Sequence, residues 1–174
     1  MKMISTSPQY TNLVSRLLIV LACLSLAACS KHVVIWKPID ASRKDQIAGA
    51  QFSVKHTGDY RFAFMFLKAE TLNDIRLQRK IWGDVDNEGV PIHVNIRIHR
   101  NKILVHNQNI RSVATAWGMT YLHEERMLNT AVRLIRIIEL VPGDYTVEIR
   151  TLDDAEQFKD IETYISFMRY NPKH

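Results

Sequence analysis

Residues 84–89 are the first candidate for chemistry, because the sequence Asp-Val-Asp-Asn-Glu-Gly spaces oxygen-bearing side chains like the start of a calcium-binding loop. Such a loop has oxygen ligands at positions one, three and five, a glycine at six and a bidentate glutamate at twelve. Position twelve here is Asn95. Calcium needs that carboxylate for charge and coordination number, so a polar turn is the better interpretation and we predict no metal site.

The histidines also form no metal motif. His123-Glu124-Glu125 begins like a zinc-protease helix, which requires a second histidine four residues after the first, but that position is Met127. His93 and His99 share one face of a predicted strand and stand roughly 20 Å apart at ~3.4 Å per residue. They cannot bind one ion, and we predict neither a metal nor another cofactor.

Candidate catalytic groups are sparse after residue 28. Five serines follow that point: Ser30, Ser42, Ser53, Ser112 and Ser166. None of them has the flanking glycines of a nucleophile elbow. Asp153 and Asp154 are paired carboxylates, but adjacent acids in a polar loop are usually solvated, and nothing in the sequence places them across a cleft. We therefore predict that the protein is not an enzyme.

Cys29 has the clearest chemical context, because residues 26–28 (Leu-Ala-Ala) precede it. Lys2 and Arg16 lie upstream, no acidic residue occurs before Cys29, and residues 17–26 form an apolar run. This is the layout of a signal peptide, and the run is about half the roughly 20 residues that a spanning helix needs. Residues 26–29 resemble a bacterial lipobox, which implies that Cys29 is acylated and becomes the first mature residue. The alternative is an ordinary secretory signal with a chance cysteine at the cleavage site.

A signal of this kind predicts a place in the cell envelope. Ser30, rather than an aspartate, follows Cys29, and by resemblance to Gram-negative lipoproteins this suggests sorting to the outer membrane, with the domain facing the periplasm. Cys23 would leave with the signal and Cys29 would carry lipid. No thiol then remains for a disulfide or a thiolate metal site, although the compartment would permit disulfides.

The charge balance argues against a nucleic-acid partner. The chain has 23 Lys+Arg and 18 Asp+Glu, and two of the basic residues, Lys2 and Arg16, lie in the signal. The mature part therefore has 21 basic against 18 acidic residues. Nucleic-acid-binding domains concentrate basic residues on one face or helix, so this mild excess predicts no nucleic-acid partner. The predicted partners are the membrane, through a lipid anchor on Cys29, and a protein in the cell envelope.

The mature chain has the size of one domain. Removing residues 1–28 leaves 146 residues, enough to bury around 70% of the surface of the unfolded chain. We divide the chain into a signal peptide (1–28), a lipidated cysteine with its tether (29–46) and a β-sandwich domain (47–174). Residues 33–36 (Val-Val-Ile-Trp) in the tether predict an edge strand or a segment that docks on the domain.

Aromatic residues at every second position predict the first strands. The alternation runs on both sides of residues 57–59 (Thr-Gly-Asp), which suit a hairpin turn, so residues 51–56 and 60–67 are expected to pair with one another. Phe62, Phe64 and Phe66 would then face one core.

A single helix is predicted for residues 71–81, because Thr71 can cap it and the apolar residues recur near helical spacing. Arg76, Arg79 and Lys80 make this helix basic. These basic side chains could contact anionic lipid headgroups, each contributing ~1 kcal/mol to membrane binding. A solvated face is the favoured interpretation, since isolated surface charges usually remain in water.

Five later strands follow from alternation and turn residues. Ile92, Val94, Ile96 and Ile98 alternate with polar residues, which predicts a half-buried strand. Residues 103–105 should be its returning arm, and residues 111–118 another short strand. Residues 132–140 are read as a strand with a bulge, and residues 161–170 as the last strand.

The segment Leu140 to Ile149 contains a Pro-Gly turn followed by Tyr145, Val147 and Ile149, which alternate inward. It resembles the corner of immunoglobulin-like sandwiches in which a tyrosine hydroxyl ties the loop to the strand. The sequence Gly58-Asp59-Tyr60 echoes Gly143-Asp144-Tyr145, as two similar entries into strands.

These motifs together resemble an uncharacterised family of proteobacterial lipoproteins. The motifs that carry the resemblance are the Gly-Asp-Tyr turn, the basic helix, the Pro-Ile-His-Val-Asn-Ile strand and the Val-Pro-Gly-Asp-Tyr corner. The resemblance implies an all-β, antiparallel immunoglobulin-like β-sandwich with one short inserted helix, preceded by a signal-peptide helix. It transfers no catalytic residue.

The function predicted from these features is that of a membrane-anchored envelope lipoprotein that binds another protein. The candidate surface is the polar face of the central strand with its neighbours, which combines Asn95, Arg97, His99 and Arg100. Two alternatives remain, namely a periplasmic immunity lipoprotein that neutralises a secreted toxin and a structural or assembly lipoprotein of the outer membrane.

Lipidation is testable at one residue. Cys29→Ser should abolish incorporation of a fatty-acid probe and either release the protein from membranes or stall its processing, because acyl chains contribute ~0.8 kcal/mol per buried methylene. Metabolic labelling followed by membrane fractionation measures both effects. Equal labelling of the two forms would refute the assignment.

Overall fold

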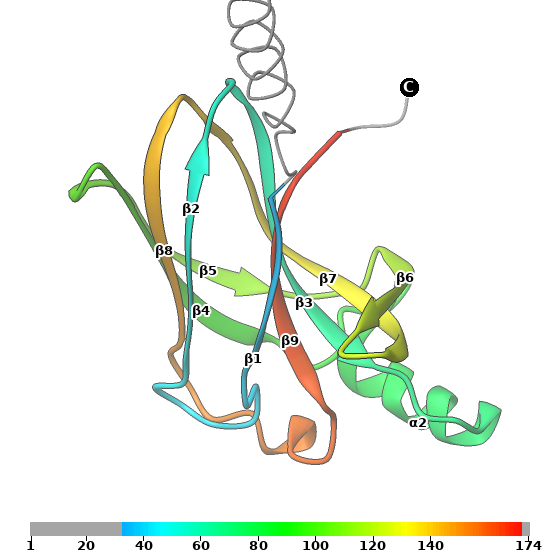
Figure 1. Ribbon diagram of the computed structural model, residues 1–174. Helices are drawn as coiled ribbons and strands as arrows, with labels where there is room; N and C mark the ends of the chain where they lie inside the picture. The colour runs from blue at the N-terminus through cyan, green and yellow to red at the C-terminus, as the bar shows by residue number, and fades with distance from the viewer. Residues whose placement is uncertain (1–32, 172–174) are drawn as a thin grey trace, which may run out of the picture. The chain divides into compact units, whose positions relative to one another are not determined.

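The computed structural model describes residues 33–171, which form two antiparallel sheets packed face to face (Figure 1). One sheet has five strands in the order β1-β9-β3-β7-β6, and the other has four in the order β2-β8-β4-β5. The predicted all-β sandwich with one short inserted helix is confirmed. Cys29 and the predicted signal-peptide helix lie outside the described residues.

The elements follow the alternation and capping signals of the sequence. The strands are β1 (Val34–Pro38), β2 (Ile47–Val54), β3 (Gly58–Leu67), β4 (Ile92–Arg100), β5 (Ile103–Ser112), β6 (Trp117–His123), β7 (Arg126–Leu140), β8 (Gly143–Thr151) and β9 (Thr163–Arg169). The helix α2 (Leu72–Trp82) joins β3 to β4, and a single 3-10 turn, η1 (Glu156–Phe158), precedes β9. Thr71 caps α2 as predicted, because its side-chain oxygen accepts the N–H of Asp74.

The predicted hairpin between residues 51–56 and 60–67 is wrong, because the two strands belong to different sheets. Strand β2 pairs with β8, with Val54 opposite Gly143. Strand β3 pairs with β7 and β9. The turn residues at 57–59 were a sound indication of a reversal, but that reversal carries the chain from one layer to the other.

One other strand assignment needs correction in the middle of the chain. The predicted strand over residues 111–118 is wrong, since β5 continues to Ser112 and β6 begins at Trp117. Residues 121–130 form the β6–β7 hairpin, whose turn residues Glu124 and Glu125 have φ values of 46° and 66°. The predicted bulge in β7 is confirmed, because the β3–β7 register shifts between Phe62 and Ala63.

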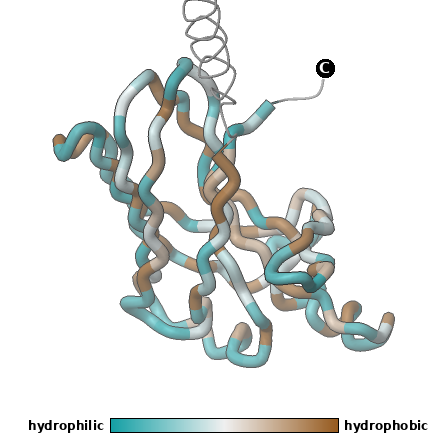
Figure 2. Tube along the Cα trace, viewed as in Figure 1, coloured by the Kyte–Doolittle hydropathy of each residue, from teal (hydrophilic) through white to brown (hydrophobic). Residues whose placement is uncertain are grey.

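The main core lies between the two sheets. Phe62, Phe64 and Phe66 of β3 are fully buried, as predicted, and share one cluster with Ile96 of β4 and Val147 of β8. In Figure 2 the hydrophobic residues follow the strands, while most of the loops are hydrophilic. Because burying a large apolar side chain contributes roughly 1.5–3 kcal/mol, this interface between the sheets is the main source of stability.

The five-stranded sheet buries its outer face as well. Ala63 and Met65 of β3 belong to a second apolar cluster with Tyr121, Leu128 and further residues of β7 and β9. Trp36 of β1 and Tyr121 of β6 have ring centroids 4.0 Å apart, although their strands form opposite edges of the sheet. Side chains of the two edge strands therefore meet across the outer face of the sheet, over the second cluster.

Strand β1 is an edge strand, so the strand alternative for residues 33–36 is confirmed. It pairs with β9, with Val34 opposite Met168 and Pro38 opposite Tyr164. The sheet therefore begins inside the range 29–46 that was expected as a tether.

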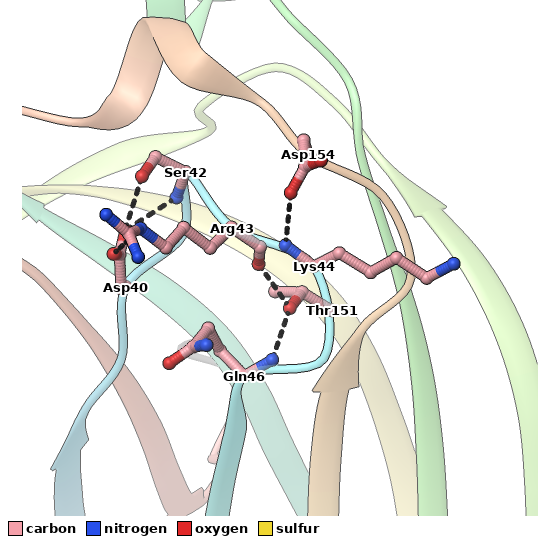
Figure 3. A network of polar contacts seen from close by, with 7 residues as sticks. All are labelled: Asp40, Ser42, Arg43, Lys44, Gln46, Thr151 and Asp154. Atoms are coloured by element: carbon pink, nitrogen blue, oxygen red, sulfur yellow. Dashed lines mark hydrogen bonds and ion pairs between the residues drawn. The ribbon is translucent and has the colours of Figure 1, made fainter.

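The connector from β1 to β2 is fixed by polar contacts to the end of β8 (Figure 3). The Thr151 hydroxyl donates to the carbonyl of Arg43 at 2.6 Å and accepts the N–H of Gln46 at 2.9 Å. Asp154 accepts the N–H of Lys44 at 2.8 Å. Hydrogen bonds from Ser42 hold the pKa of Asp40 below its usual range.

The predicted tyrosine corner is confirmed. Tyr145 is buried, and its hydroxyl donates to the carbonyl of Val141 at 2.8 Å. The two Gly-Asp-Tyr sequences each place a tyrosine beside the same ring, because Tyr60 and Tyr145 both stack on Phe52. Phe52 of β2 has its centroid 5.7 Å from Tyr60 and 5.9 Å from Tyr145.

Arg133 of β7 is fully buried, and its guanidinium is held by backbone carbonyls. It donates to the carbonyl of Val90 at 2.8 Å, to that of Ser112 at 3.4 Å, and to those of Ile81 and Trp82 at the end of α2. The rings of Phe66 and Phe158 lie 5.2 and 5.4 Å from the guanidinium carbon. Burial lowers the pKa of Arg133 to about 10, so the side chain stays charged at neutral pH.

Two tyrosines provide a matched test of these assignments. Tyr145→Phe removes a bonded hydroxyl and leaves the Val141 carbonyl without its partner, so it should lower the free energy of unfolding by about 1 kcal/mol. Tyr121→Phe removes a buried hydroxyl that has no hydrogen-bond partner among the described residues, so it should be neutral or stabilising. Urea unfolding of both variants measures the difference.

Tyr145→Ala is the more severe change, because losing the ring as well typically costs ~3–5 kcal/mol. A Tyr145→Ala variant that melts with the wild type, or a Tyr121→Phe variant that loses more than Tyr145→Phe, would contradict the description of the corner.

Candidate functional site

The outer face of the four-stranded sheet carries most of the predicted binding residues. Val94, Ile96 and Ile98 of β4 point into the core, and side chains alternate along a strand. Asn95, Arg97 and His99 therefore share the outward face, as the sequence predicted. We call this surface, with the residues opposite them on β5 and β8, the β4 face.

Asn95 is the centre of an amide ladder. Its side-chain nitrogen donates to the side-chain oxygen of Asn107 at 2.9 Å and to that of Asn109 at 2.7 Å, both on β5. Asn107 and Asn109 are exposed. Both acceptors keep their own amide N–H groups for a further partner, so the ladder presents donors at the edge of the sheet.

Arg97 is the exposed cation of the β4 face. It lies opposite Asn107 on β5 and Glu148 on β8, but it forms no ion pair within residues 33–171. His99 follows on the same face, opposite Thr146 and Leu104. The face thus offers a guanidinium, an imidazole and amides on rigid strands.

Arg100, the fourth predicted binding residue, does not share the outward face of β4 with Asn95, Arg97 and His99. It follows Ile98 at the alternate position and lines a cavity together with Ile98 and Tyr145. Its stem lies close to Gly143, where an added Cβ would come within 2.9 Å of Cγ. The strand alternation that places His99 outside turns Arg100 to the other side.

A groove extends the β4 face toward the tip of the β4–β5 hairpin. It encloses about 620 Å³ and is lined by residues of β2, β8 and the hairpin turn, among them Gln51, Ser53, Lys102, Asp144 and Thr146. The Ser53 hydroxyl donates to the Asp144 carboxylate at 2.5 Å. The groove wall is fixed further by Asn101, whose backbone N–H donates to the carbonyl of Asp144 at 2.8 Å.

Strand β5 is an open edge next to this face. It pairs with β4 on one side and is the last strand of its sheet, and the β4–β5 hairpin projects at the left of Figure 1. Ile103, Leu104 and Val105 at the tip are exposed by 69, 51 and 50%. Such an edge carries unpaired backbone donors and acceptors that can join another strand.

The β5 asparagines were missed by the sequence reasoning, which ended the returning arm at residue 105. Asn107 and Asn109 alternate like the residues opposite them, and the turn at Asn101-Lys102 sets the register that brings them beside Asn95. A longer reading of the hairpin would have found them.

The acidic residues considered as metal or catalytic candidates, in residues 84–89 and at Asp153 and Asp154, form hydrogen bonds or ion pairs with neighbouring residues. In residues 84–89 the N–H of Asp86, aided by Arg79, holds the pKa of Asp84 below its usual range. Asp153 contacts the Nδ1 atom of His93 at 2.8 Å, while Asp154 binds the connector. Between residues 33 and 171 no three His, Cys, Asp or Glu side chains gather to hold a metal ion. No helix in that range has the length and hydropathy to cross a membrane.

Charge reversal at the β4 face should be tolerated by the fold. Arg97→Glu places a second carboxylate opposite Glu148, and like charges across strands cost roughly 0.2–1 kcal/mol. We expect the free energy of unfolding in urea to fall by no more than about 1 kcal/mol. A fall of several kcal/mol would show that Arg97 has a structural role instead.

Comparison with known proteins identifies a family. The family model described as a domain of unknown function, DUF5625, matches residues 36–169. The crystal structure of GEBA250068378 from Sulfurospirillum deleyianum is similar in fold, with a TM-score of 0.65, 13% sequence identity, and coverage of 80% of this chain and 99% of that one. No curated protein sequence matches. The match over most of the sandwich shows that this chain belongs to the DUF5625 family.

Proposed function

We propose that this protein is a membrane-anchored envelope lipoprotein of the outer membrane that binds another protein through the β4 face. The observation that supports this best is the combination of the amide ladder, Arg97 and the open edge of β5 on one rigid sheet. Arginine is enriched in protein interfaces, and an extended partner segment can add to an open edge with backbone hydrogen bonds.

The shape of this surface favours a protein over a small ligand. The β4 face is a sheet surface continued by an open groove, and the hairpin tip adds the exposed side chains Ile103, Leu104 and Val105. Contiguous exposed apolar residues beside polar ones are typical of interaction sites. A partner that covers the tip would bury this apolar surface.

The proposed anchor would hold the sandwich close to the membrane. Strand β1 begins at Val34, five residues after Cys29 in the sequence, and five extended residues span at most ~18 Å. Val34 lies opposite Met168, which lies opposite Arg61 near the start of β3. That end of the sheet is the end to which the proposed anchor would be joined.

Helix α2 is then directed away from the anchored end. It follows Leu67, six residues beyond Arg61 along β3, which corresponds to roughly 20 Å of strand. The basic residues Arg76 and Lys80 are exposed there. This placement supports a solvated face for α2 over contact with the membrane that holds the anchor.

Capture of the partner tests the proposal. The tagged full chain, extracted in mild detergent, would serve as bait in envelope extracts, beside Arg97→Glu and beside Arg136→Glu, an equal charge change at an exposed residue of the other sheet. We expect wild type and Arg136→Glu to retain one envelope protein that Arg97→Glu loses, with mass spectrometry as the readout.

Equal capture by all three forms would exclude the β4 face as the binding surface. Failure of the wild type to retain any protein, or hydrolytic activity in the purified chain, would overturn the binding function itself. A captured secreted toxin would favour the immunity alternative, and a captured assembly factor the structural one.

A further inference from the structure

A cavity of about 170 Å³ lies at the tyrosine corner, between the β4–β5 hairpin and the end of β7. It is on the inner side of β4 and is therefore separate from the β4 face. Its walls are largely aliphatic and include Ile98, Val105, Ile138, Leu140 and Val141. Because a water molecule occupies about 30 Å³ in the liquid, the cavity has room for roughly six groups of that size. A short alkyl chain with one polar end fits such a volume.

Arg100 supplies a cation to the wall of this cavity. Ile98, two residues earlier on β4, is buried in the core, and the alternation of the strand turns Arg100 to the same side. The stem of Arg100 lies over Gly143, where an added Cβ would come within 2.9 Å of Cγ. Arg100 forms no ion pair within residues 33–171. Its guanidinium is suited to bind a ligand carboxylate, since its N–H donors match both carboxylate oxygens.

His106 supplies a second polar group to the same wall. It lies opposite Ile98 across β4 and β5, so its side chain is on the side of the sheet that Ile98 and Arg100 share. The Nε2 atom of His106 is buried and has no hydrogen-bond partner among the described residues. A buried polar atom without a partner costs free energy, and a ligand oxygen that accepts a proton from Nε2 would remove this cost.

The acidic residue of the lining, Glu139, does not neutralise this pair. Ile138 and Leu140 on either side of it pack in the core, so the alternation of β7 directs the Glu139 side chain to the outer face of the five-stranded sheet. Asp59 lies opposite Glu139 on that outer face. Among the described residues that line the cavity, the side chains directed inward are therefore aliphatic, aromatic or nitrogen-bearing, and none of them is a carboxylate.

We propose that the corner cavity binds a short branched-chain monocarboxylate of about the size of isovalerate. The guanidinium of Arg100 binds the carboxylate, and Nε2 of His106 donates to one of its oxygens. The alkyl group lies against Val105 and Ile138. A neutral amide of the same shape would leave the guanidinium without a counter-charge, and a shorter acid would leave the aliphatic wall uncovered.

The test is an NMR titration of the isotope-labelled full chain in mild detergent. Isovalerate should shift the side-chain resonances of Arg100 and His106 in a saturable manner. Isovaleramide, which lacks the charge, and acetate, which lacks the alkyl group, should each bind at least about tenfold more weakly, equivalent to 1.4 kcal/mol. N-acetyl-L-valine, which imitates the C-terminal residue of a protein, should also bind more weakly, because its acetamido group exceeds the volume of the cavity.

Variants assign the binding to the two polar residues. Arg100→Gln should weaken isovalerate binding at least about tenfold, and His106→Leu should weaken it as well. Arg97→Gln is the matched control, since this arginine is on the same strand but on the outward β4 face, and it should bind isovalerate like the wild type. Melting curves distinguish loss of binding from loss of fold.

Four results would overturn the proposal. The first is the absence of a saturable shift at about 10 mM isovalerate, a concentration that fills even a site with a millimolar Kd. The second is equal binding of isovaleramide, and the third is unchanged binding by a folded Arg100→Gln variant. The fourth is tighter binding of N-acetyl-L-valine than of isovalerate, because the cavity would then recognise the C-terminus of a polypeptide. The comparison of ligands needs only the wild type, so it decides even where a variant does not fold.

Discussion

The guanidinium of Arg133 is the contact on which much of the architecture depends. A charge buried without a carboxylate is costly unless its donors are satisfied. Here backbone carbonyls accept from both terminal nitrogens of the guanidinium, while Nε has no partner among the described residues. Two of these carbonyls, from Ile81 and Trp82, lie at the end of α2, where the helix dipole favours a cation. Val90 and Ser112 contribute the others, so one side chain fixes the helix end, the loop before β4 and the end of β5.

This arrangement connects the fold to the proposed binding surface. Ser112 is the last residue of β5, and its own hydroxyl donates to the carbonyl of Leu134 on β7. Strand β5 is therefore held at one end and open along its outer edge, which gives the β4 face a rigid base. The five-stranded sheet opposite it is stiffened by burial on both faces and by the contact of Trp36 with Tyr121. A surface on rigid strands can recognise a partner with little loss of conformational entropy.

Local sequence patterns correctly predicted the features that depend on residues close together in the chain. The alternation in β4 and the Pro-Gly turn before Tyr145 identified the inward residues, and Thr71 identified the start of α2, because alternation, turn and capping preferences act within a few residues. The β2–β3 hairpin was predicted wrongly, since a turn signal shows that the chain reverses but not which sheet it enters. Which strand pairs with β2 is decided by the packing of both layers.

The residues of the candidate site were also predicted only in part. Asn95, Arg97 and His99 share a face because of alternation, and the same rule, applied one residue further, assigns Arg100 to the side of Ile98. Asn107 and Asn109 required the register of the hairpin, which depends on the turn at Asn101-Lys102. The role of Arg133 could not be read from periodicity, since its partners are carbonyls more than 20 residues away in sequence.

Hydrogen–deuterium exchange of the full chain, compared between wild type, Arg133→Met and Arg126→Met, tests this dependence most directly. Arg126 is an exposed arginine on the same strand and serves as the control. Without the guanidinium, exchange should rise selectively in α2, in residues 83–91 and at the end of β5, because their carbonyls lose a shared donor. Arg126→Met should match the wild type. Unchanged protection of those segments in a folded Arg133→Met variant would contradict the central role of this arginine.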